Sequence, residues 1–551
     1  MTDRQQRRPA AVVTGGGGGI GTAVALELAR RDIAVVAMDP GVGLQGEPLG
    51  EPTAEQTARR ITAEGGVARA STASVTDPGA VRALFAEVAS EFGGLDIVVS
   101  TAGILRFAPF LEASQDDWRA VLDVHLNGYL NVLAGALPVM AAAGYGRVVG
   151  VTSGAGLARA AADSAHYSCA KRAVAAVTWG LAGLLPEGVA LNALSPLAAT
   201  RMVTGGRSGG SGPASGGPGP VGLDLSAMPA PQDMAPAAAY LAGEPACRGQ
   251  VIFSAGPELS LISPPRLIEA VRTGGTADFA ASLDTLVPVV LGPAEDRQRS
   301  TGGSNARFGP VFDQPGTTGP VAGPASRRCL VVADNATLAG ALAPALARCG
   351  MTAIDVAGPP AGFAAAEEAV RRAGGIDAIV IAPGSFAAGP SVPLSWEEML
   401  AGYASTTDCV LAHVGWLRAA AREAVRAARP LRVVHLADAT SPPLYPAAQA
   451  VAQLARCANL VWASLLRPDL IDVFSIALET AEPADHQPVA QLAARLLWSG
   501  DAGPLRGAEM FARPGWIGVR SHPGPAATAS YGSAAMPPWI GDWLAEAARR
   551  P

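Results

Sequence analysis

A chain of 551 residues is longer than one hydrophobic core usually supports, so we expect two or more domains. Hydrophobic residues make up 49% of the sequence and charged residues 16%, which excludes a disordered chain. The net charge of −6 comes without basic runs, arguing against nucleic acid and membrane surfaces as partners. Because we find neither an apolar leader nor a stretch of about 20 apolar residues, we expect a cytoplasmic protein.

The cysteines and lysines are unusually informative. The six cysteines are far apart and form no CxxC pair, so we expect no metal site and no disulfide framework. In contrast, Lys171 is the single lysine of the sequence. A composition that has replaced lysine with arginine almost everywhere suggests that the chemistry needs an ammonium group at this one position.

Short apolar runs alternate with helical patterns between about residues 10 and 255. Successive apolar residues indicate strands buried on both faces, and the runs are AAVVTG, IAVVAMD, LDIVVSTAG, GRVVGVTS, VALNALSP and GQVIFSAG. Helical patterns such as GTAVALELARR lie between them. This alternation predicts an α/β fold, a doubly wound parallel sheet of the Rossmann type.

A glycine-rich turn follows the first apolar run. Gly15, Gly19, Ile20 and Gly21 stand between the strand and the next helix, where backbone N–H groups can bind a pyrophosphate. Asp39 ends the next strand, and a carboxylate there accepts hydrogen bonds from the adenosine ribose hydroxyls while repelling a 2′-phosphate. The sequence therefore predicts a dinucleotide site that prefers NAD, with NADP the less favoured alternative.

The segment HYSCAKRAV contains a candidate proton-transfer pair, Tyr167 and Lys171. A spacing of four on the predicted helix puts both side chains on one face. An ammonium group lowers the pKa of a nearby phenol, and the phenolate can then remove a hydroxyl proton as hydride leaves for the nicotinamide.

The second half of the sequence repeats the first. Residues 203–222 are almost pure glycine, serine and proline and predict a loop, and an extended connection follows later. From about residue 326, GGIDAIVIAPGSFAAGPSVPLSWEEML corresponds to GGLDIVVSTAGILRFAPFLEASQDDWRAVL. We predict a first domain over residues 1–262, a linker over 263–325, a second domain over 326–522 and a C-terminal tail over 523–551.

Residues 10–262 resemble the short-chain dehydrogenase/reductase family, and the resemblance rests on the glycine turn, Asp39 and the Tyr167/Lys171 pair. Within the family, the sequence is most similar to the hydroxyacyl-CoA dehydrogenase domain of peroxisomal multifunctional enzyme type 2, and the segments that carry this similarity include DPGVGLQG, TAGILRFAPF and PLAATRM. The resemblance implies an NAD-dependent oxidoreductase that interconverts a secondary alcohol and a ketone. A 3-hydroxyacyl thioester or a polyketide-like intermediate of specialised metabolism is the substrate we expect.

The resemblance also implies roles for single residues. Tyr167 is expected to be the acid/base and Lys171 its activator, and both also contact the cofactor. Ser153 is expected to hydrogen-bond the substrate oxygen. The family's usual spacing would put Gly154 at that position, and a loop one residue longer restores the serine.

Further positions follow from the same resemblance. Ala102 and Gly103 are expected along the cofactor, and Thr200 at its carboxamide. His125 replaces the asparagine that often completes the family's proton relay, with Asn127 two residues on. Either His125 sustains a water relay or it packs beneath the sheet.

The second half lacks these features. Its glycine turn has become ADNATLAG, and Ala450 and Leu454 stand where Tyr167 and Lys171 would align. We therefore expect a degenerate domain without a cofactor site, which serves as the other half of an intrachain pseudo-dimer; further association of two chains stays open.

The C-terminal segment PPWIGDWLAEAARR predicts an amphipathic helix with Trp539, Trp543 and Leu544 on one side, either covering the first half's pocket or packing elsewhere. Two other functions stay open for the whole chain. One is a non-redox reaction in the same fold, namely dehydration, epimerisation or cyclisation. The other is a cofactor-binding scaffold.

Overall fold

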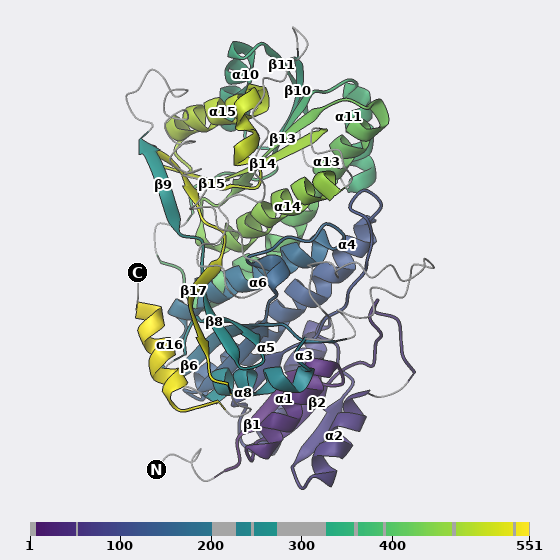
Figure 1. Cartoon of the computed structure of the whole chain (residues 1–551), viewed down its shortest axis with the longest axis vertical. Helices are drawn as coiled ribbons and strands as arrows, with labels where there is room; N and C mark the ends of the chain where they lie inside the picture. Colours follow the sequence, from purple (N-terminus) through teal and green to yellow (C-terminus); the bar gives the residue numbers. More distant parts are fainter. Residues whose placement is uncertain are drawn as a thin grey trace.

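The structure, a computed structural model, describes nine stretches of the chain: 7–50, 53–200, 228–243, 247–272, 327–356, 362–389, 393–464, 470–532 and 536–549. The predicted loop 203–222 and most of the predicted linker lie outside these residues. The described residues form two helix-covered sheets, one in each half of the chain (Figure 1).

The first half contributes eight strands to its own sheet: β1 (Ala10–Thr14), β2 (Ala34–Met38), β3 (Ala68–Ser71), β4 (Ile97–Ser100), β5 (Gly146–Val151), β6 (Val189–Pro196), β7 (Val251–Ala255) and β8 (Glu258–Ser263). They lie in the order β3-β2-β1-β4-β5-β6-β7-β8, parallel throughout except for the antiparallel β8. All six strands expected from apolar runs are present, and the prediction of a doubly wound α/β fold is confirmed.

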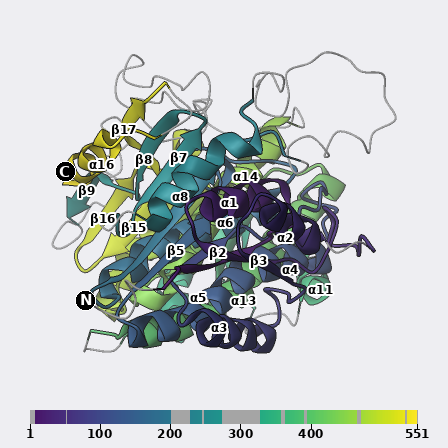
Figure 2. The same cartoon turned by 90° about the horizontal axis from the view of Figure 1, so that it is seen from below.

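Helices cover both faces of the first sheet: α1 (Gly19–Arg30), α2 (Thr53–Ala63), α3 (Pro78–Phe92), α4 (Gln115–Leu122), α5 (Gly128–Ala142), α6 (Ala165–Leu181) and α8 (Ala235–Gly243). Seen from below, α1 and α8 lie on one side of the sheet and α3 and α5 on the other (Figure 2). Their apolar faces bury strands that are themselves apolar on both sides, which is why the strands read as continuous hydrophobic runs.

The second half has its own strands, β10 (Arg327–Ala333), β11 (Met351–Val356), β12 (Ala378–Ala382), β13 (Leu431–Asp438), β14 (Ile471–Leu478), β15 (Glu509–Arg513) and β16 (Trp516–Arg520). Its helices are α10 (Ala336–Arg348), α11 (Phe363–Ala373), α12 (Trp396–Gly402), α13 (Thr406–Ala427), α14 (Tyr445–Ser464) and α15 (Pro483–Trp498). The strand order β11-β10-β12-β13-β14-β15-β16 repeats the first sheet's order, with no described counterpart of β3.

The two halves exchange their last strands. β9 (Leu267–Arg272) follows β8 in the chain but pairs antiparallel with β16 of the second sheet. β17 (Gly524–Ser530) follows β16 but pairs antiparallel with β8 of the first sheet (Figure 1). The sequence-based boundaries at 263–325 and 523–551 therefore need correction, because both segments contain an edge strand of the opposite sheet.

The C-terminal helix α16 (Trp539–Arg549) packs beside the first sheet. Its buried residues are Ile540, Leu544 and Ala547, whereas the Trp539 side chain is 46% exposed. The prediction that Trp539 lies on the apolar side of this helix was therefore wrong, whereas the prediction for Leu544 is confirmed. Trp543 is half-buried against the core that includes α1 and α8, which favours ordinary packing over a lid.

A helical interface joins the halves in the middle of the molecule. α6 lies side by side with α14, and α4 with α13 (Figure 1). Trp118, Trp416 and Trp462 are fully buried there, in one hydrophobic core that includes residues of both halves. The halves therefore share a core and do not behave as separate units on a linker.

Candidate active site

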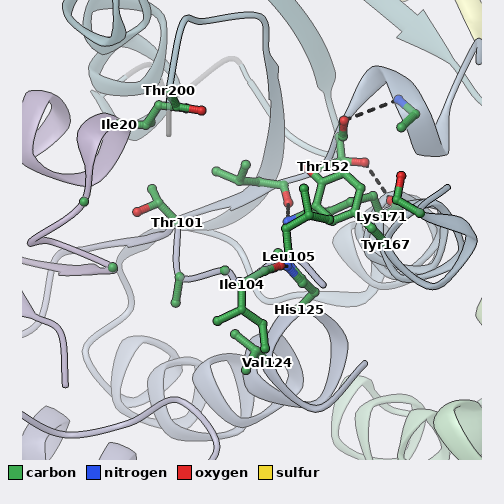
Figure 3. A pocket seen from close by; sticks show the side chains of 18 of the residues that line it. Ile20, Thr101, Ile104, Leu105, Val124, His125, Thr152, Tyr167, Lys171 and Thr200 are labelled. Atoms are coloured by element: carbon green, nitrogen blue, oxygen red, sulfur yellow. Dashed lines mark hydrogen bonds between the residues drawn. The ribbon is translucent and has the colours of Figure 1, made fainter. Parts of the chain in front are cut away.

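A cavity of about 1450 Å³ opens at the carboxyl ends of the first sheet's parallel strands, the edge where α/β folds bind ligands. All the residues expected from the sequence to take part in catalysis or cofactor binding line it: Gly15, Gly19, Ile20, Gly21, Asp39, Ala102, Gly103, His125, Asn127, Ser153, Tyr167, Lys171 and Thr200. Figure 3 shows Ile20 and Thr200 on one side of this cavity, and His125, Tyr167 and Lys171 on the other. The structure thus brings together groups that lie up to 185 positions apart in the sequence, from Gly15 to Thr200.

The glycine turn is shaped by close backbone contacts. Gly15 has φ of +65°, and a Cβ there would lie 2.8 Å from the Ala102 backbone. A Cβ on Gly21 would lie 2.0 Å from the Gly15 carbonyl oxygen. No side chain of the described residues caps the N-terminus of α1, and its first turn holds no acidic residue. These free N–H groups suit an anionic group such as a pyrophosphate.

Asp39 lies at the end of β2 and is only 8% exposed. Its Oδ2 accepts a hydrogen bond from Gly17 N at 3.1 Å, and its Oδ1 accepts one from Gly41 N at 2.8 Å. These backbone donors fix the carboxylate in the cavity wall next to the glycine turn. Its position matches a dinucleotide whose ribose hydroxyls need an acceptor.

Tyr167 and Lys171 lie on one face of α6, and the Lys171 Nζ is 5.6 Å from the centre of the Tyr167 ring (Figure 3). Lys171 Nζ donates a hydrogen bond to the Val151 carbonyl at 2.7 Å. Burial lowers the pKa of Lys171 to about 7. Burial raises the pKa of Tyr167, while a hydrogen bond with Ser153 lowers it.

His125 lies in a π-helical turn, Asp123–Asn127, inserted between α4 and α5. The ring meets the Tyr167 ring edge-on, with centroids 5.1 Å apart, and its Nε2 is 2.6 Å from the Ile104 carbonyl oxygen. Burial holds the pKa of His125 well below its usual range, so the ring is neutral at pH 7. Nδ1 is buried and has no hydrogen-bond partner within the described residues. π-helical turns like the one that carries His125 often mark functional sites.

The side-chain nitrogen and oxygen of Asn127 both have hydrogen-bond partners. Its Nδ2 donates to Asp123 Oδ1 at 2.8 Å, and its Oδ1 accepts from Thr407 Oγ1 at 2.8 Å. Thr407 belongs to α13 of the second half. This contact across the interface was not predicted from the sequence.

Sequence reasoning also missed Ala404 and Leu460, second-half residues that line the cavity. It missed Gln453 and Arg456 of α14, which bond to the loop between Ser153 and α6. One signal was present: Gln449, Gln453 and Arg456 recur at helical spacing in an otherwise apolar segment.

Known proteins resemble the first half in sequence. The profile of the short chain dehydrogenase family matches residues 9–208. A hydroxyacyl-CoA dehydrogenase of Mycobacterium tuberculosis is 31% identical over 274 residues, which cover 47% of this chain and 81% of the relative. The chain belongs to the short-chain dehydrogenase/reductase family.

Other family members match shorter stretches. An uncharacterized NAD-dependent oxidoreductase of the same organism is 34% identical over 32% of this chain and 66% of the relative. The aligned part thus spans just under two thirds of that relative. The peroxisomal hydratase-dehydrogenase-epimerase of Saccharomyces cerevisiae is 34% identical over 33% of this chain and 20% of the relative. The printed names of these relatives describe NAD-dependent oxidoreductase, hydroxyacyl-CoA dehydrogenase and hydratase-dehydrogenase-epimerase proteins.

Among the residues that the structure describes, no helix combines the length and the hydropathy that crossing a membrane requires. The same residues contain no cluster of three histidine, cysteine or acidic side chains able to hold a metal ion.

Proposed function

We propose that this chain is an NAD-dependent dehydrogenase or reductase that interconverts a secondary alcohol and a ketone. One observation supports this most: Tyr167, Ser153 and the sole lysine share a cavity with an uncapped glycine turn. A phenol, a hydroxyl and an ammonium group on one wall can hold a carbonyl or hydroxyl oxygen and move its proton.

Each residue has a distinct part in this chemistry. NAD, held by the glycine turn and Asp39, supplies the hydride acceptor when it is bound. Tyr167 takes the proton of the substrate hydroxyl, and Lys171 stabilises the phenolate through its positive charge. Ser153, which hydrogen-bonds Tyr167, donates to the same substrate oxygen.

His125 is proposed to position Tyr167 and to continue the path of the proton. Its edge-on ring limits the movement of the phenol, and its unpartnered Nδ1 suits one ordered water. A Cβ on Gly103 would lie 2.4 Å from the His125 ring, so this arrangement needs glycine at that position.

The preference for NAD and the substrate class are part of the same proposal. The Asp39 carboxylate disfavours a 2′-phosphate, which supports NAD over NADP. The relatives named for hydroxyacyl-CoA and peroxisomal dehydrogenase activities support a 3-hydroxyacyl thioester as the first substrate to test. A polyketide-like intermediate carries the same hydroxyl and ketone chemistry.

We further propose that the second half is a duplicated copy that binds no dinucleotide. Its strand order supports duplication. Asn335 caps α10 by accepting from Leu338 N at 2.9 Å, so a side chain already occupies one N–H group of this helix's first turn. Asp334 accepts from Gly384 N beside it, and its negative charge opposes a phosphate.

The test measures NADH formation from NAD with 3-hydroxyacyl thioesters and with free secondary alcohols. Tyr167→Phe should lower the rate by about 10²- to 10⁴-fold. Tyr531→Phe is the matched control, because that phenol lies outside the residues that line the cavity. Calorimetry with NAD and NADP measures cofactor preference directly.

Substrate conversion without net NADH formation, but with dependence on Tyr167, would favour a non-redox reaction instead. Turnover that is indifferent to Tyr167→Phe and Lys171→Ala would refute the proposed mechanism. Dinucleotide binding with no conversion of any substrate in the panel, and no effect of either change, would favour a scaffold.

A further inference from the structure

The loop from Gly154 to Ser164, which we call the substrate loop, joins Ser153 to α6. It supplies much of the cavity wall next to Tyr167. Its own backbone hydrogen bonds lie near its start, where Gly156 N donates to Ser153 O and Arg159 N donates to Gly154 O.

Two side chains of the second half hold this loop from outside. Gln453 Nε2 donates to the carbonyl oxygens of Ala155 and Arg159, both at 2.7 Å. Arg456 donates to Leu157 O at 2.8 Å and to Ala158 O at 3.1 Å. Four of five successive carbonyl groups of the loop are therefore bonded to one helix of the other half.

Both donor side chains are buried, since Gln453 and Arg456 are 0% and 1% exposed, and the contact between Arg456 and Leu157 is buried at both ends. A hydrogen bond from a charged guanidinium to a buried carbonyl is stronger than a neutral one, and losing it leaves a buried acceptor unsatisfied. Gln453 Oε1 also accepts from Arg456 at 3.1 Å, which fixes the two donors relative to each other.

The second half also reaches the cavity itself. Two of its residues line the cavity. Leu460 lies one turn beyond Arg456 on α14, and Ala404 lies in the 3₁₀ turn that precedes α13. The same helix therefore holds the loop backbone at one point and forms part of the wall at another.

We infer that the second half is a positioning partner: Gln453 and Arg456 fix the substrate loop and so determine which substrates the cavity accepts. The inference rests on the proposed function of this cavity. It assigns the degenerate copy a part in specificity, beyond supplying an apolar surface, and it makes Gln453 and Arg456 positioning residues that do not touch the substrate.

The experiment compares Gln453→Leu and Arg456→Met in the full-length chain. Asn459→Ala is the matched control, because Asn459 lies on the same helix but bonds to Ala455 and Val473 of its own half. Hydrogen–deuterium exchange at residues 154–164 should rise about tenfold or more in the two loop variants and stay at the wild-type rate in the control.

Kinetics provide the second measurement. With the thioester that the wild type oxidises best, each loop variant should raise KM and lower kcat/KM by about tenfold. The Kd for NAD should stay within about twofold of wild type, because the glycine turn is on the other side of the cavity. A structural defect alone would weaken NAD binding as well.

Wild-type exchange in the substrate loop of both variants would overturn the inference, as would equal effects of Asn459→Ala. If Gln453→Leu fails to fold, Arg456→Lys keeps the charge but loses the forked contact, and the inference requires faster loop exchange there too. The exchange measurement needs no substrate. Failure of the proposed function, seen as turnover indifferent to Tyr167→Phe, therefore remains distinguishable from failure of this inference.

Discussion

The buried ion pair between the halves allows a quantitative prediction. Arg172 of α6 and Glu509 of β15 are 1% and 2% exposed, and their Nη2 and Oε2 atoms are 2.5 Å apart. Gln449 of α14 bonds to both of them. We predict that Glu509→Gln strongly destabilises the chain, because it leaves a buried guanidinium without its counter-charge.

The magnitude follows from the pKa of Glu509. Burial raises it, but Arg172, together with His522 and Gln449, outweighs burial and holds the pKa at about 2. Relative to an ordinary value of 4.5, this shift corresponds to about 3 kcal/mol of stability at neutral pH. Because the folded-state pKa is the lower one, this stability is fully present above about pH 4.5 and is lost as the pH falls towards 2.

Urea unfolding followed by tryptophan fluorescence measures this difference. At pH 7 Glu509→Gln should unfold with about 3 kcal/mol less free energy than wild type, and at pH 3 the difference should shrink to about 1 kcal/mol. Glu55→Gln, in an exposed pair with Arg59, should change stability by less than about 1 kcal/mol.

The double variant Arg172→Met/Glu509→Leu removes both charges and should recover most of the loss. A difference below about 1 kcal/mol at pH 7 for Glu509→Gln, or one that does not shrink in acid, would refute the reasoning.

Three further predictions concern the cavity. Gly21→Ala should abolish NAD binding in calorimetry while circular dichroism stays native, since its Cβ would lie 2.0 Å from the Gly15 carbonyl oxygen and displace the turn; unchanged affinity would contradict this. For the coupled Tyr167/Lys171 pair, which must lose one proton to act as a base, kcat/KM for alcohol oxidation should rise with pH and level off above about 7, the pKa of Lys171, and a profile that is flat below pH 7 would argue against this pair. Arg159 lines the cavity, where burial lowers its pKa, and its guanidinium is suited to bind a phosphate group of coenzyme A. Arg159→Met should therefore reduce kcat/KM about tenfold for a coenzyme A thioester but not for the uncharged N-acetylcysteamine thioester of the same acyl group.

Local features of this protein could be predicted from the sequence because their physical causes are local. The glycine turn, Asp39 and the Tyr167/Lys171 pair each depend on residues within one strand, one turn or one helix face. The strands could be predicted because a parallel sheet covered on both faces requires continuous apolar runs. These elements alone place the proposed cofactor-binding residues and the proposed proton-transfer pair at one edge of a sheet.

The tertiary structure decided which strand completes which sheet. β9 and β17 exchange places through backbone hydrogen bonds, whose carbonyl acceptors all residues have and whose N–H donors only proline lacks, so no side-chain pattern encodes the partner. It also decided that His125 lies against Tyr167, because this depends on a π-helical turn and on the close approach of Gly103.

Contacts between the halves likewise had no local signature. Gln453 and Arg456 read as polar residues of a degenerate helix, and only the packing of α14 against α6 brings them to the carbonyl groups of the substrate loop. A buried donor must find an acceptor wherever the fold supplies one, and here the acceptors lie nearly 300 positions away. The sequence thus determined the residue types on which the proposed chemistry of the first half depends, and the tertiary structure determined which residues of the second half lie against its cavity and substrate loop.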